Sequence, residues 1–249
     1  MTLSPPADQF AISGTFNFRD VGGLRTADGT TTRPGVLLRS AQLSGLDAKG
    51  HDTLRALRVT DVHDLRGLAE IDHIGHDTLP DGVRLHVTPF DSRMGEAPPH
   101  EAQQTSARAH MIEVYRLFPV MPEAHGAIIR LATSVAEGDG AALVHCAAGK
   151  DRTGWAVATV LRAVGVTEDD VYADYLASNA AVEPLRMMLE PKIATDGALS
   201  IDLLGVREEY LRTADVSVRE TYGGTEGYLS AIGLTGPLRE ALRTRLNAS

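Results

Sequence analysis

The chain has 249 residues, of which 43% are hydrophobic and 23% are charged, proportions that are typical of a globular protein. Its net charge of −9 argues against a general nucleic-acid-binding protein, because such proteins are usually basic. No apolar run approaches the ~20 residues of a membrane span, and residues 1–10 lack the features of a secretory signal. We therefore expect a cytoplasmic protein, with non-classical export left open. The single cysteine excludes an intramolecular disulfide.

The first half of the chain predicts strands and one helix. In chain order we expect a loose arm over 1–14, a strand over 36–40, a helix over 49–57 with Asp47 as its N-cap, strands over 60–65 and 83–87, and a loop over 91–106 that is rich in Pro, Gly, Glu and Gln.

The second half is mostly helical. We expect a helix over 107–118, a break near Pro119 and Pro122, a helix to about 135, a strand over 141–144, a helix over 155–161, and helices from 167 onward with a glycine-rich break at 223–227. Strands interleaved with helices predict an α/β sheet that is covered on both faces. No repeat or long linker divides the chain, so residues 1–249 are expected to form one domain.

The only cysteine lies in the run His145-Cys146-Ala147-Ala148-Gly149-Lys150-Asp151-Arg152-Thr153, between the strand over 141–144 and the helix over 155–161. A loop in this position directs several backbone N–H groups into one concavity at a helix N-terminus, which favours an anion. A thiolate in that concavity would be stabilised and would act as a nucleophile at neutral pH.

Each residue type in this run suits phosphate chemistry. Cys146 can attack phosphorus, and the planar fork of Arg152 matches two phosphate oxygens. Gly149 permits a tight turn without a Cβ. Thr153 can donate a hydroxyl hydrogen bond to the sulfur, which would favour the thiolate. A buried, inert cysteine is the usual alternative, but it does not explain the small and polar residues that end in Arg-Thr.

The Cys-x5-Arg-Thr run resembles the loop of cysteine-dependent phosphatases. Its inner residues are similar to those of a bacterial tyrosine/lipid phosphatase family related to mycobacterial protein tyrosine phosphatase B. The resemblance extends in order along nearly the whole chain, through Phe16-Asn17-Phe18-Arg19-Asp20-Val21, Arg33–Ser40, Thr60–Arg66, Ala173–Asn179, Leu204–Tyr210 and Glu220-Thr221-Tyr222-Gly223.

This resemblance implies a largely parallel, phosphatase-type sheet flanked by helices, with the phosphate loop at the carboxyl end of its central strand. It also implies a helical C-terminal part in which residues 181–203 form a lid over the site. The chain is shorter than the family pattern across both 181–203 and 91–106.

Two aspartates compete to protonate the leaving oxygen of the ester. Asp91 follows a predicted strand and opens the loop over 91–106, and its place in Thr88-Pro89-Phe90-Asp91 matches an aspartate of the family. Asp151 lies inside the phosphate loop, where it could protonate the leaving group, activate water or hold Arg152. We rank Asp91 first; the alternative is that it serves only as a turn or cap residue.

The remaining residues of the run have supporting roles. Residues Ala147 to Arg152 are expected to bind the substrate phosphate, and His145 to anchor the loop through ring hydrogen bonds. Lys150 could meet a second phosphate on an inositol ring, or it could be a solvated surface lysine. Four further residues that match family motifs are interpreted first as buried ion-pair or capping groups: Arg19, Asp20, Asp64 and Arg66.

The sequence therefore predicts a phosphomonoesterase that works through a phosphocysteine, without metal or cofactor. The expected substrates are phosphotyrosine proteins, with phosphoserine, phosphothreonine and phosphoinositides as further or even main substrates, and the product is inorganic phosphate. A sulfur transferase and a non-catalytic phosphate-binding module remain as alternatives.

Overall fold

The computed structural model describes residues 11–90, 107–189 and 200–248. Its centre is a five-stranded sheet in the order β3 (Arg19–Asp20), β4 (Leu37–Ser40), β7 (Ala141–His145), β5 (Val59–Asp64) and β6 (Arg84–Val87). Strands β4, β7, β5 and β6 run parallel, and β3 pairs antiparallel with β4. The predicted α/β class with a largely parallel sheet is confirmed.

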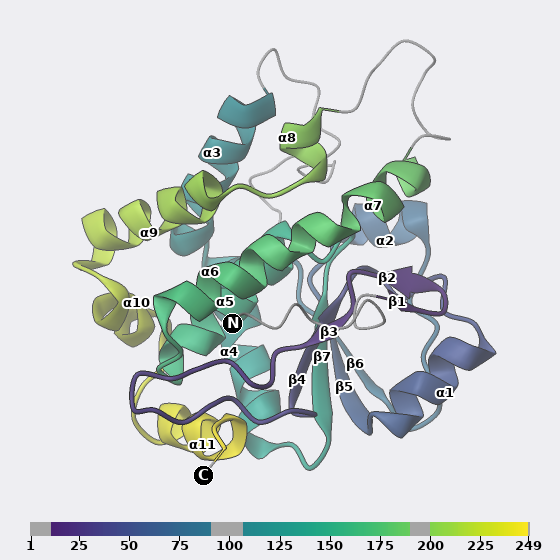
Figure 1. Cartoon of the computed structure of the whole chain (residues 1–249), viewed down its shortest axis with the longest axis horizontal. Coiled ribbons are helices and arrows are strands. Elements are labelled where there is room, and N and C mark those ends of the chain that lie inside the picture. Colours follow the sequence, from purple (N-terminus) through teal and green to yellow (C-terminus); the bar gives the residue numbers. More distant parts are fainter. Residues whose placement is uncertain (1–10, 91–106, 190–199, 249) are drawn as a thin grey trace.

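Helices cover both faces of this sheet (Figure 1). Helix α1 lies on one face, whereas α4 and α5 pack on the other. In chain order the helices are α1 (Ala48–Ala56), α2 (Leu68–Ile74), α3 (Ala107–Leu117), α4 (Pro122–Glu137), α5 (Asp151–Ala163), α6 (Glu168–Ala177), α7 (Val182–Leu189), α8 (Ile201–Leu204), α9 (Glu208–Tyr222), α10 (Thr225–Ile232) and α11 (Gly236–Leu246), with 3-10 turns at Phe118–Val120 and Ser178–Ala181.

The central strand β7 shows why the sheet is covered on both sides. Ala142 and Val144 belong to the large hydrophobic cluster on the side of α4 and α5, whereas Ala141 and Leu143 belong to the smaller cluster beneath α1. Side chains alternate between the two faces of a strand, so a continuous apolar run is what a strand buried on both faces requires. The polar residues that follow β7 are thereby held at its carboxyl end.

Two predicted breaks are confirmed. The first helix after residue 106 ends before Pro119, and α4 restarts at Pro122, because proline lacks the N–H that a helix interior needs. Helix α9 ends at Gly223 with φ of +77°, and Gly224 follows with φ of +129°, so the chain turns sharply into α10.

Three features were not predicted: strand β3 at the edge of the sheet, a short hairpin and helix α2. A short antiparallel hairpin of β1 (Ala11–Ile12) and β2 (Thr15–Phe16) reaches into the region expected to be a loose arm. Helix α2 lies between β5 and β6, where no helix was expected. Gly67, the N-cap residue, has no side chain that could cap the helix. Instead its backbone N–H donates to the carboxylate of Glu70 in the first turn, at 2.9 Å. Leu68 is also 66% exposed, so α2 lacks the apolar face that would reveal it in the sequence.

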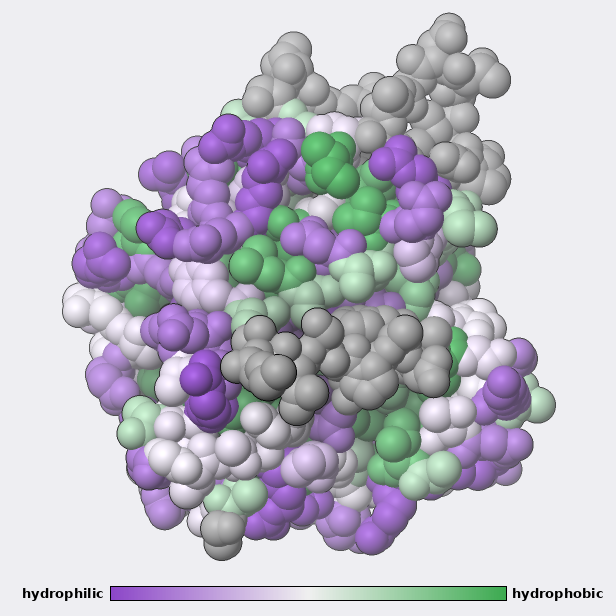
Figure 2. All heavy atoms as spheres, viewed as in Figure 1, coloured by the Kyte–Doolittle hydropathy of each residue, from purple (hydrophilic) through white to green (hydrophobic). Residues whose placement is uncertain are grey.

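No helix in the described ranges is long and apolar enough to cross a membrane. Hydrophilic residues predominate on the face in Figure 2, and hydrophobic residues gather over α8 and beside α7. Among the large apolar side chains on these two helices, Met187 is 65% and Ile201 is 54% exposed.

Candidate active site

The cysteine loop lies where the sequence predicts it, between the end of β7 and the start of α5. Cys146 is the first residue after the central strand, and Asp151 is the first residue of α5. The thiol is buried, with 3% of the residue exposed. The carboxyl end of a central parallel strand, opposite a helix N-terminus, is a usual place for a phosphate site.

Three consecutive carbonyl groups of the loop are held by hydrogen bonds from outside it. The Ala147 carbonyl accepts from the Gln42 N–H at 3.2 Å. The Asn17 Nδ2 donates to both the Ala148 and the Gly149 carbonyls at 3.0 Å. Because each peptide directs its carbonyl and its N–H in opposite senses, the N–H groups of this run are turned the other way.

These N–H groups have no acceptor within the part of the chain that the structure describes. Among the described residues, no acceptor is found for the backbone N–H groups of residues 147–151 and 153, which include residues of the first turn of α5. A helix leaves its first N–H groups unsatisfied and carries a partial positive charge at this end. The loop is therefore built to surround an anion next to Cys146.

Gly149 is required by geometry at the tightest point of the loop. Its φ is +67°, and a Cβ at this position would lie 2.1 Å from the carbonyl oxygen of Ser40 in β4. Both the left-handed backbone and the close approach exclude a side chain. The loop can pack against the end of β4 only with glycine here.

A buried ion-pair network holds the outer side of the loop. Arg39 donates to the Gly149 carbonyl at 2.8 Å and pairs with Asp174 at 2.5 Å. Arg19 pairs with the other oxygen of Asp174 at 2.8 Å and donates to the Asn17 Oδ1 at 2.7 Å. Burial and the nearby Arg39 lower the pKa of Arg19 to about 10, so this guanidinium is still charged at neutral pH.

Arg152 is held by a carboxylate that the sequence did not reveal. Its two terminal nitrogens bond the two oxygens of Glu70 at 2.5 and 2.7 Å. Burial raises the pKa of Glu70, but the hydrogen bonds and charge of Arg152 outweigh it and hold the pKa below its ordinary value. A bidentate pair of this kind fixes the plane of the guanidinium. Glu70 lies on the unpredicted α2, far from Arg152 in sequence.

Asp151 makes contacts other than the predicted one with Arg152. Its Oδ1 accepts from the Tyr115 hydroxyl at 2.9 Å, and its Oδ2 lies 3.0 Å from the Lys150 ammonium. Burial and the Asp151 charge raise the pKa of Tyr115 well above its ordinary value, so this phenol stays a donor. The role of holding Arg152 falls to Glu70.

Lys150 is neither solvated nor free to meet a second substrate phosphate. Only 2% of the residue is exposed, and its ammonium donates to the carbonyls of Leu203 at 2.5 Å and Gly205 at 3.2 Å. Together with Asp151 these acceptors occupy its three protons. Lys150 therefore ties the loop to the chain around α8, which corrects both interpretations made from the sequence.

The described parts of the predicted lid, residues 181–189 and 200–203, pack on the loop. Leu185 and Leu189 of α7 and Leu204, next to that segment, form a small apolar cluster with Ala148. Residues 190–199 lie outside the described residues. The segment therefore contacts the loop directly, and its action as a lid stays a prediction.

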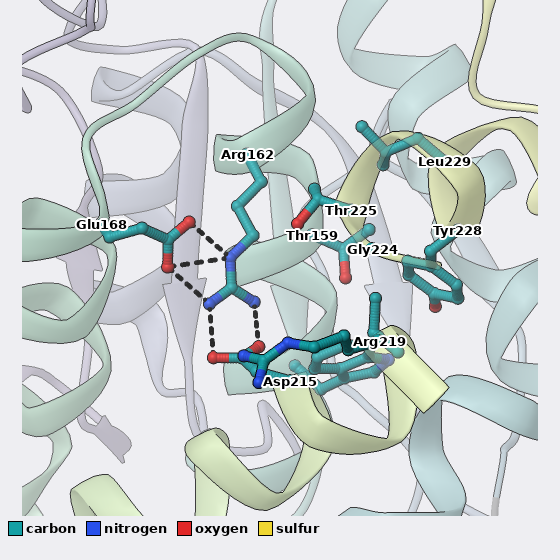
Figure 3. Close-up of a pocket in the computed structure, with 11 residues that line it drawn as sticks. Thr159, Arg162, Glu168, Asp215, Arg219, Gly224, Thr225, Tyr228 and Leu229 are labelled. Atoms are coloured by element: carbon teal, nitrogen blue, oxygen red, sulfur yellow. Dashed lines mark hydrogen bonds and ion pairs between the residues drawn. The ribbon is translucent and has the colours of Figure 1, made fainter. Parts of the chain in front are cut away.

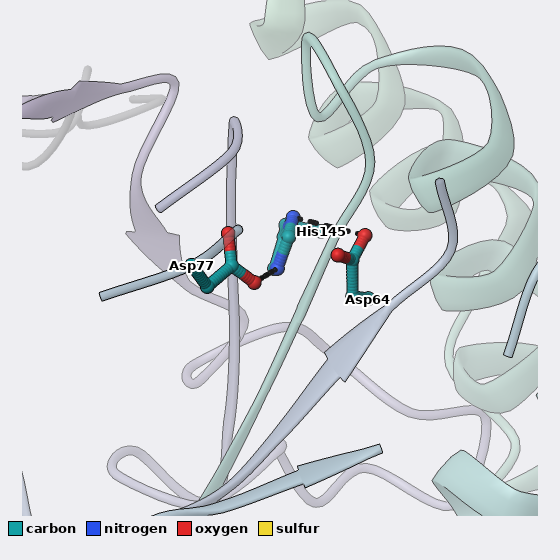
Figure 4. Close-up of side chains that lie close together, drawn as sticks. All are labelled: Asp64, Asp77 and His145. Atoms are coloured by element: carbon teal, nitrogen blue, oxygen red, sulfur yellow. Dashed lines mark hydrogen bonds and ion pairs between the residues drawn. The ribbon is translucent and has the colours of Figure 1, made fainter. Parts of the chain in front are cut away.

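His145 anchors the loop through its ring, as the sequence suggested. Figure 4 shows this ring between the carboxylates of Asp77 and Asp64. Its Nε2 lies 2.7 Å from the Asp77 carboxylate, and its Nδ1 lies 3.2 Å from the Cys146 carbonyl. Burial lowers the pKa of His145, but the charges of Asp77 and Asp64 outweigh burial and raise it to about 9. The ring is therefore protonated at neutral pH and can donate from both nitrogens.

The same carboxylates are also paired with an arginine. Arg66 bonds both oxygens of Asp64 and lies 2.9 Å from an oxygen of Asp77. The residues Asp64, Asp77 and His145 are of types that bind metal ions, and their ligand atoms lie close together. The Arg66 guanidinium and the protonated imidazole already supply two positive charges, so these residues fit an ion-pair network and not a metal site.

Of two further predicted site residues, one makes no contact that assigns it a role and the other lies outside the described residues. Thr153 is fully buried, and its hydroxyl makes no hydrogen bond with a described residue, so the predicted bond to the sulfur is not formed. Asp91 lies outside the described residues. The described chain ends just before it at Phe90, which is buried in the large hydrophobic cluster.

The chain combines a central parallel strand, a Cys-x5-Arg loop whose N–H groups face away from its outside contacts, and an arginine that a carboxylate holds in place. This combination is typical of phosphatases with a Cys-x5-Arg loop. A model of the tyrosine phosphatase family matches residues 10–248. The chain therefore belongs to the tyrosine phosphatase family and is a phosphoric monoester hydrolase.

Individual relatives agree with this assignment. The triple specificity protein phosphatase PtpB of Mycobacterium tuberculosis is 38% identical over 263 aligned positions, which cover 90% of this chain and 94% of that protein. A protein of Cupriavidus necator is 34% identical, with 86% and 80% covered. A tyrosine-protein phosphatase of Nostoc commune is 28% identical, with 85% and 74% covered.

The substitution Glu70→Gln tests how Arg152 is positioned. It keeps the shape of the side chain but removes the charge, so we expect kcat/KM for p-nitrophenyl phosphate to fall by roughly ten- to a hundredfold. The matched control is Glu226→Gln, which removes a similar bidentate partner from Arg239 at the surface and should leave activity unchanged. Equal activity of the two variants would show that Glu70 does not position Arg152.

The pair of His145 and Asp77 predicts a pH dependence of stability. The folded-state pKa of His145, about 9, lies above its ordinary value of 6.5. The resulting stabilisation is fully present below pH 6.5 and is lost as the pH rises through 9, by an amount on the order of a few kcal/mol.

Urea unfolding between pH 6 and pH 10 measures this loss. The decline in the free energy of unfolding should be clear in the wild type and much smaller in Asp77→Asn. An NMR titration of the His145 ring in the wild type gives a second reading, with a midpoint near pH 9 expected. A midpoint at or below 6.5 would contradict the pairing.

Proposed function

We propose that this enzyme hydrolyses phosphotyrosine in proteins through a phosphocysteine intermediate, and that it also accepts phosphoserine, phosphothreonine and phosphoinositides. The carrying observation is the orientation of the loop: its carbonyls are bound from outside, and its N–H groups are left for an anion beside Cys146. Such prearranged donors stabilise the charge on phosphate oxygens in the transition state.

The reaction has two steps. In the first, the Cys146 thiolate attacks phosphorus, the bond to the ester oxygen breaks, and that oxygen takes up a proton from a carboxylic acid. In the second, water attacks the phosphocysteine and gives a proton to the carboxylate that the first step left, the S–P bond breaks, the thiolate leaves and inorganic phosphate is released. Arg152 and the loop N–H groups bind the phosphate oxygens throughout, so their contribution grows as charge develops.

The proton source is proposed to be Asp91, with Asp151 as the alternative. Both oxygens of Asp151 already have partners, Tyr115 and Lys150, so neither is free to hold a proton for the leaving group in this arrangement. Asp91 itself lies outside the described residues, and it directly follows Phe90, which is buried against Phe118. The occupied oxygens of Asp151 support the ranking made from the sequence.

The breadth of substrates is proposed from the relative in Mycobacterium tuberculosis that is named a triple specificity phosphatase. The lysine in the loop does not add support for lipid substrates, because Lys150 is occupied by the carbonyls of Leu203 and Gly205. We therefore propose phosphotyrosine as the main substrate, with phosphoinositides as the alternative main activity.

The substitution Cys146→Ser tests the covalent mechanism. The loop N–H groups and Arg152 remain, so turnover of a phosphotyrosine peptide should fall below detection while the dissociation constant for the peptide changes by less than about threefold. Steady-state hydrolysis and equilibrium binding measure the two effects. Residual hydrolysis above the uncatalysed rate would exclude Cys146 as the nucleophile.

The same assay separates the other candidate functions. Wild-type kcat/KM should be highest on a phosphotyrosine peptide, lower on phosphoserine peptides and short-chain phosphoinositides, and absent for sulfur transfer from thiosulfate to cyanide. Thiosulfate turnover would favour the sulfur transferase. Tight binding of phosphopeptides without any turnover would favour the non-catalytic module.

Phosphate esters with good and poor leaving groups show which aspartate protonates the leaving oxygen. Asp91→Asn should lower turnover of phenyl phosphate by roughly 10²–10⁴-fold and that of p-nitrophenyl phosphate much less, because only a poor leaving group needs the proton. Asp151→Asn should lower both, since it also removes the partner of Lys150 and Tyr115. Equal losses on the two esters for Asp91→Asn would move the acid role to Asp151.

A further inference from the structure

The Asp151 carboxylate is held from two sides, although it belongs to the loop that surrounds the anion. Its Oδ1 accepts a hydrogen bond from the Tyr115 hydroxyl at 2.9 Å, and its Oδ2 lies 3.0 Å from the Lys150 ammonium. Only 3% of Asp151 is exposed, and Tyr115 is fully buried. The Oδ1 atom is therefore directed into the protein interior, toward the phenol of α3.

The Tyr115 hydroxyl is itself held in the orientation that this bond needs. The Tyr175 hydroxyl of α6 donates to it at 2.8 Å, so the single hydroxyl proton of Tyr115 is left for Asp151. Burial raises the pKa of both Tyr115 and Tyr175 well above the ordinary value, so both phenols keep their protons at neutral pH. The two tyrosines thus form a chain of donors that ends at the carboxylate.

Neighbouring aromatic rings fix the position of the Tyr115 ring. Its centroid lies 5.0, 6.1 and 5.7 Å from the ring centroids of Phe118, Tyr175 and Tyr210. A side chain that is packed in this way occupies one rotamer. The hydroxyl therefore reaches Asp151 from a fixed direction, which is how residues outside the substrate's reach position those next to it.

A carboxylate that could turn freely at this position would oppose phosphate binding. A phosphate monoester carries a charge of about −1.5 to −2 at pH 7, and a like charge within roughly 4–6 Å disfavours it. Asp151 is the first residue of α5 and the neighbour of Arg152, so it lies directly beside the anion position. Its side chain must therefore be kept away from the phosphate.

We propose that Tyr115 is a positioning residue of the active site, whose hydroxyl holds the Asp151 carboxylate away from the anion position. The loop thereby keeps its affinity for a phosphate dianion. Lys150 completes the arrangement at the other oxygen of Asp151. Tyr115 acts only through Asp151 and does not contact the substrate. The inference rests on the proposed phosphate site beside Cys146, but not on the covalent step.

The substitution Tyr115→Phe tests this role, because it keeps the packed ring and removes only the hydroxyl. Asp151 then loses one of its two partners and can turn toward the phosphate. We expect the inhibition constant Ki of inorganic phosphate, measured against p-nitrophenyl phosphate, to rise roughly tenfold. The value of kcat should change by less than about threefold, since the repulsion acts on the bound ester and on the transition state alike.

Tyr228 offers a matched control at another part of α5 (Figure 3). Only 2% of Tyr228 is exposed, and its ring packs on Trp155 at 5.6 Å. It lies in the wall of a cavity of about 300 Å³ whose described lining includes none of residues 145–153. Its hydroxyl lies near Trp155 and Thr159 and not near the loop. Tyr228→Phe should therefore leave both Ki and kcat unchanged.

A double-mutant comparison shows whether Tyr115 acts through Asp151. Asp151→Asn removes the charge, so adding Tyr115→Phe to that variant should change Ki by less than about twofold. A loss of general structure would instead raise Ki equally in both backgrounds. If Tyr115→Phe does not fold, Tyr175→Phe removes only the donor behind Tyr115, and a rise in Ki of about two- to fivefold is expected in the wild-type background alone.

The outcomes separate this inference from the proposed function. A Ki that is unchanged in Tyr115→Phe, or that rises equally with and without the Asp151 charge, would overturn the role of Tyr115 and leave the phosphate site intact. A wild-type enzyme that inorganic phosphate does not inhibit would overturn the proposed phosphate site, and the inference with it.

Discussion

The site depends on the direction in which a few peptide groups face. The carbonyls of Ala148 and Gly149 are bound from outside the loop by Asn17 and Arg39, which leaves the N–H groups for an anion. Asn17 itself has φ of +54°, a left-handed conformation that asparagine tolerates better than most residues. Asp174 connects the two donors, because it pairs with Arg39 and with the Arg19 that bonds Asn17. The Asp174 carboxylate on α6 thus positions the residues that hold the backbone of the cysteine loop.

Buried charges are arranged around the loop in three groups, each of which contains both signs. Asp174 lies between Arg19 and Arg39, Glu70 holds Arg152, and Asp77 with Asp64 balances Arg66 and the protonated His145. Replacement of a buried ion pair by apolar residues is often neutral for stability, whereas removal of one partner is costly. These groups therefore specify the position of each loop residue more than they stabilise the fold.

Much of the fold and the centre of the site could be predicted from the sequence. The apolar run of β7, the prolines at 119 and 122 and the glycines at 223 and 224 are local signals. The site residues Cys146, Gly149 and Arg152 could also be predicted, because they lie together in one short run of sequence. By contrast, Glu70 pairs with Arg152, 82 positions away, and Asp77 pairs with His145, 68 positions away. No local sequence pattern predicts such pairings. Lys150 was misjudged because two of its three acceptors are distant backbone carbonyls, which no side-chain pattern reveals.

The central claim is that Cys146 carries the phosphoryl group between the two steps. Acid quench of the enzyme during turnover of a phosphotyrosine peptide, followed by mass spectrometry of the fragment that contains Cys146, measures this directly. A phosphoryl group on the Cys146 sulfur that forms and disappears with the substrate is the predicted result. Normal turnover with Cys146 unmodified at every quench time, and with the phosphoryl group found on another residue, would contradict the account.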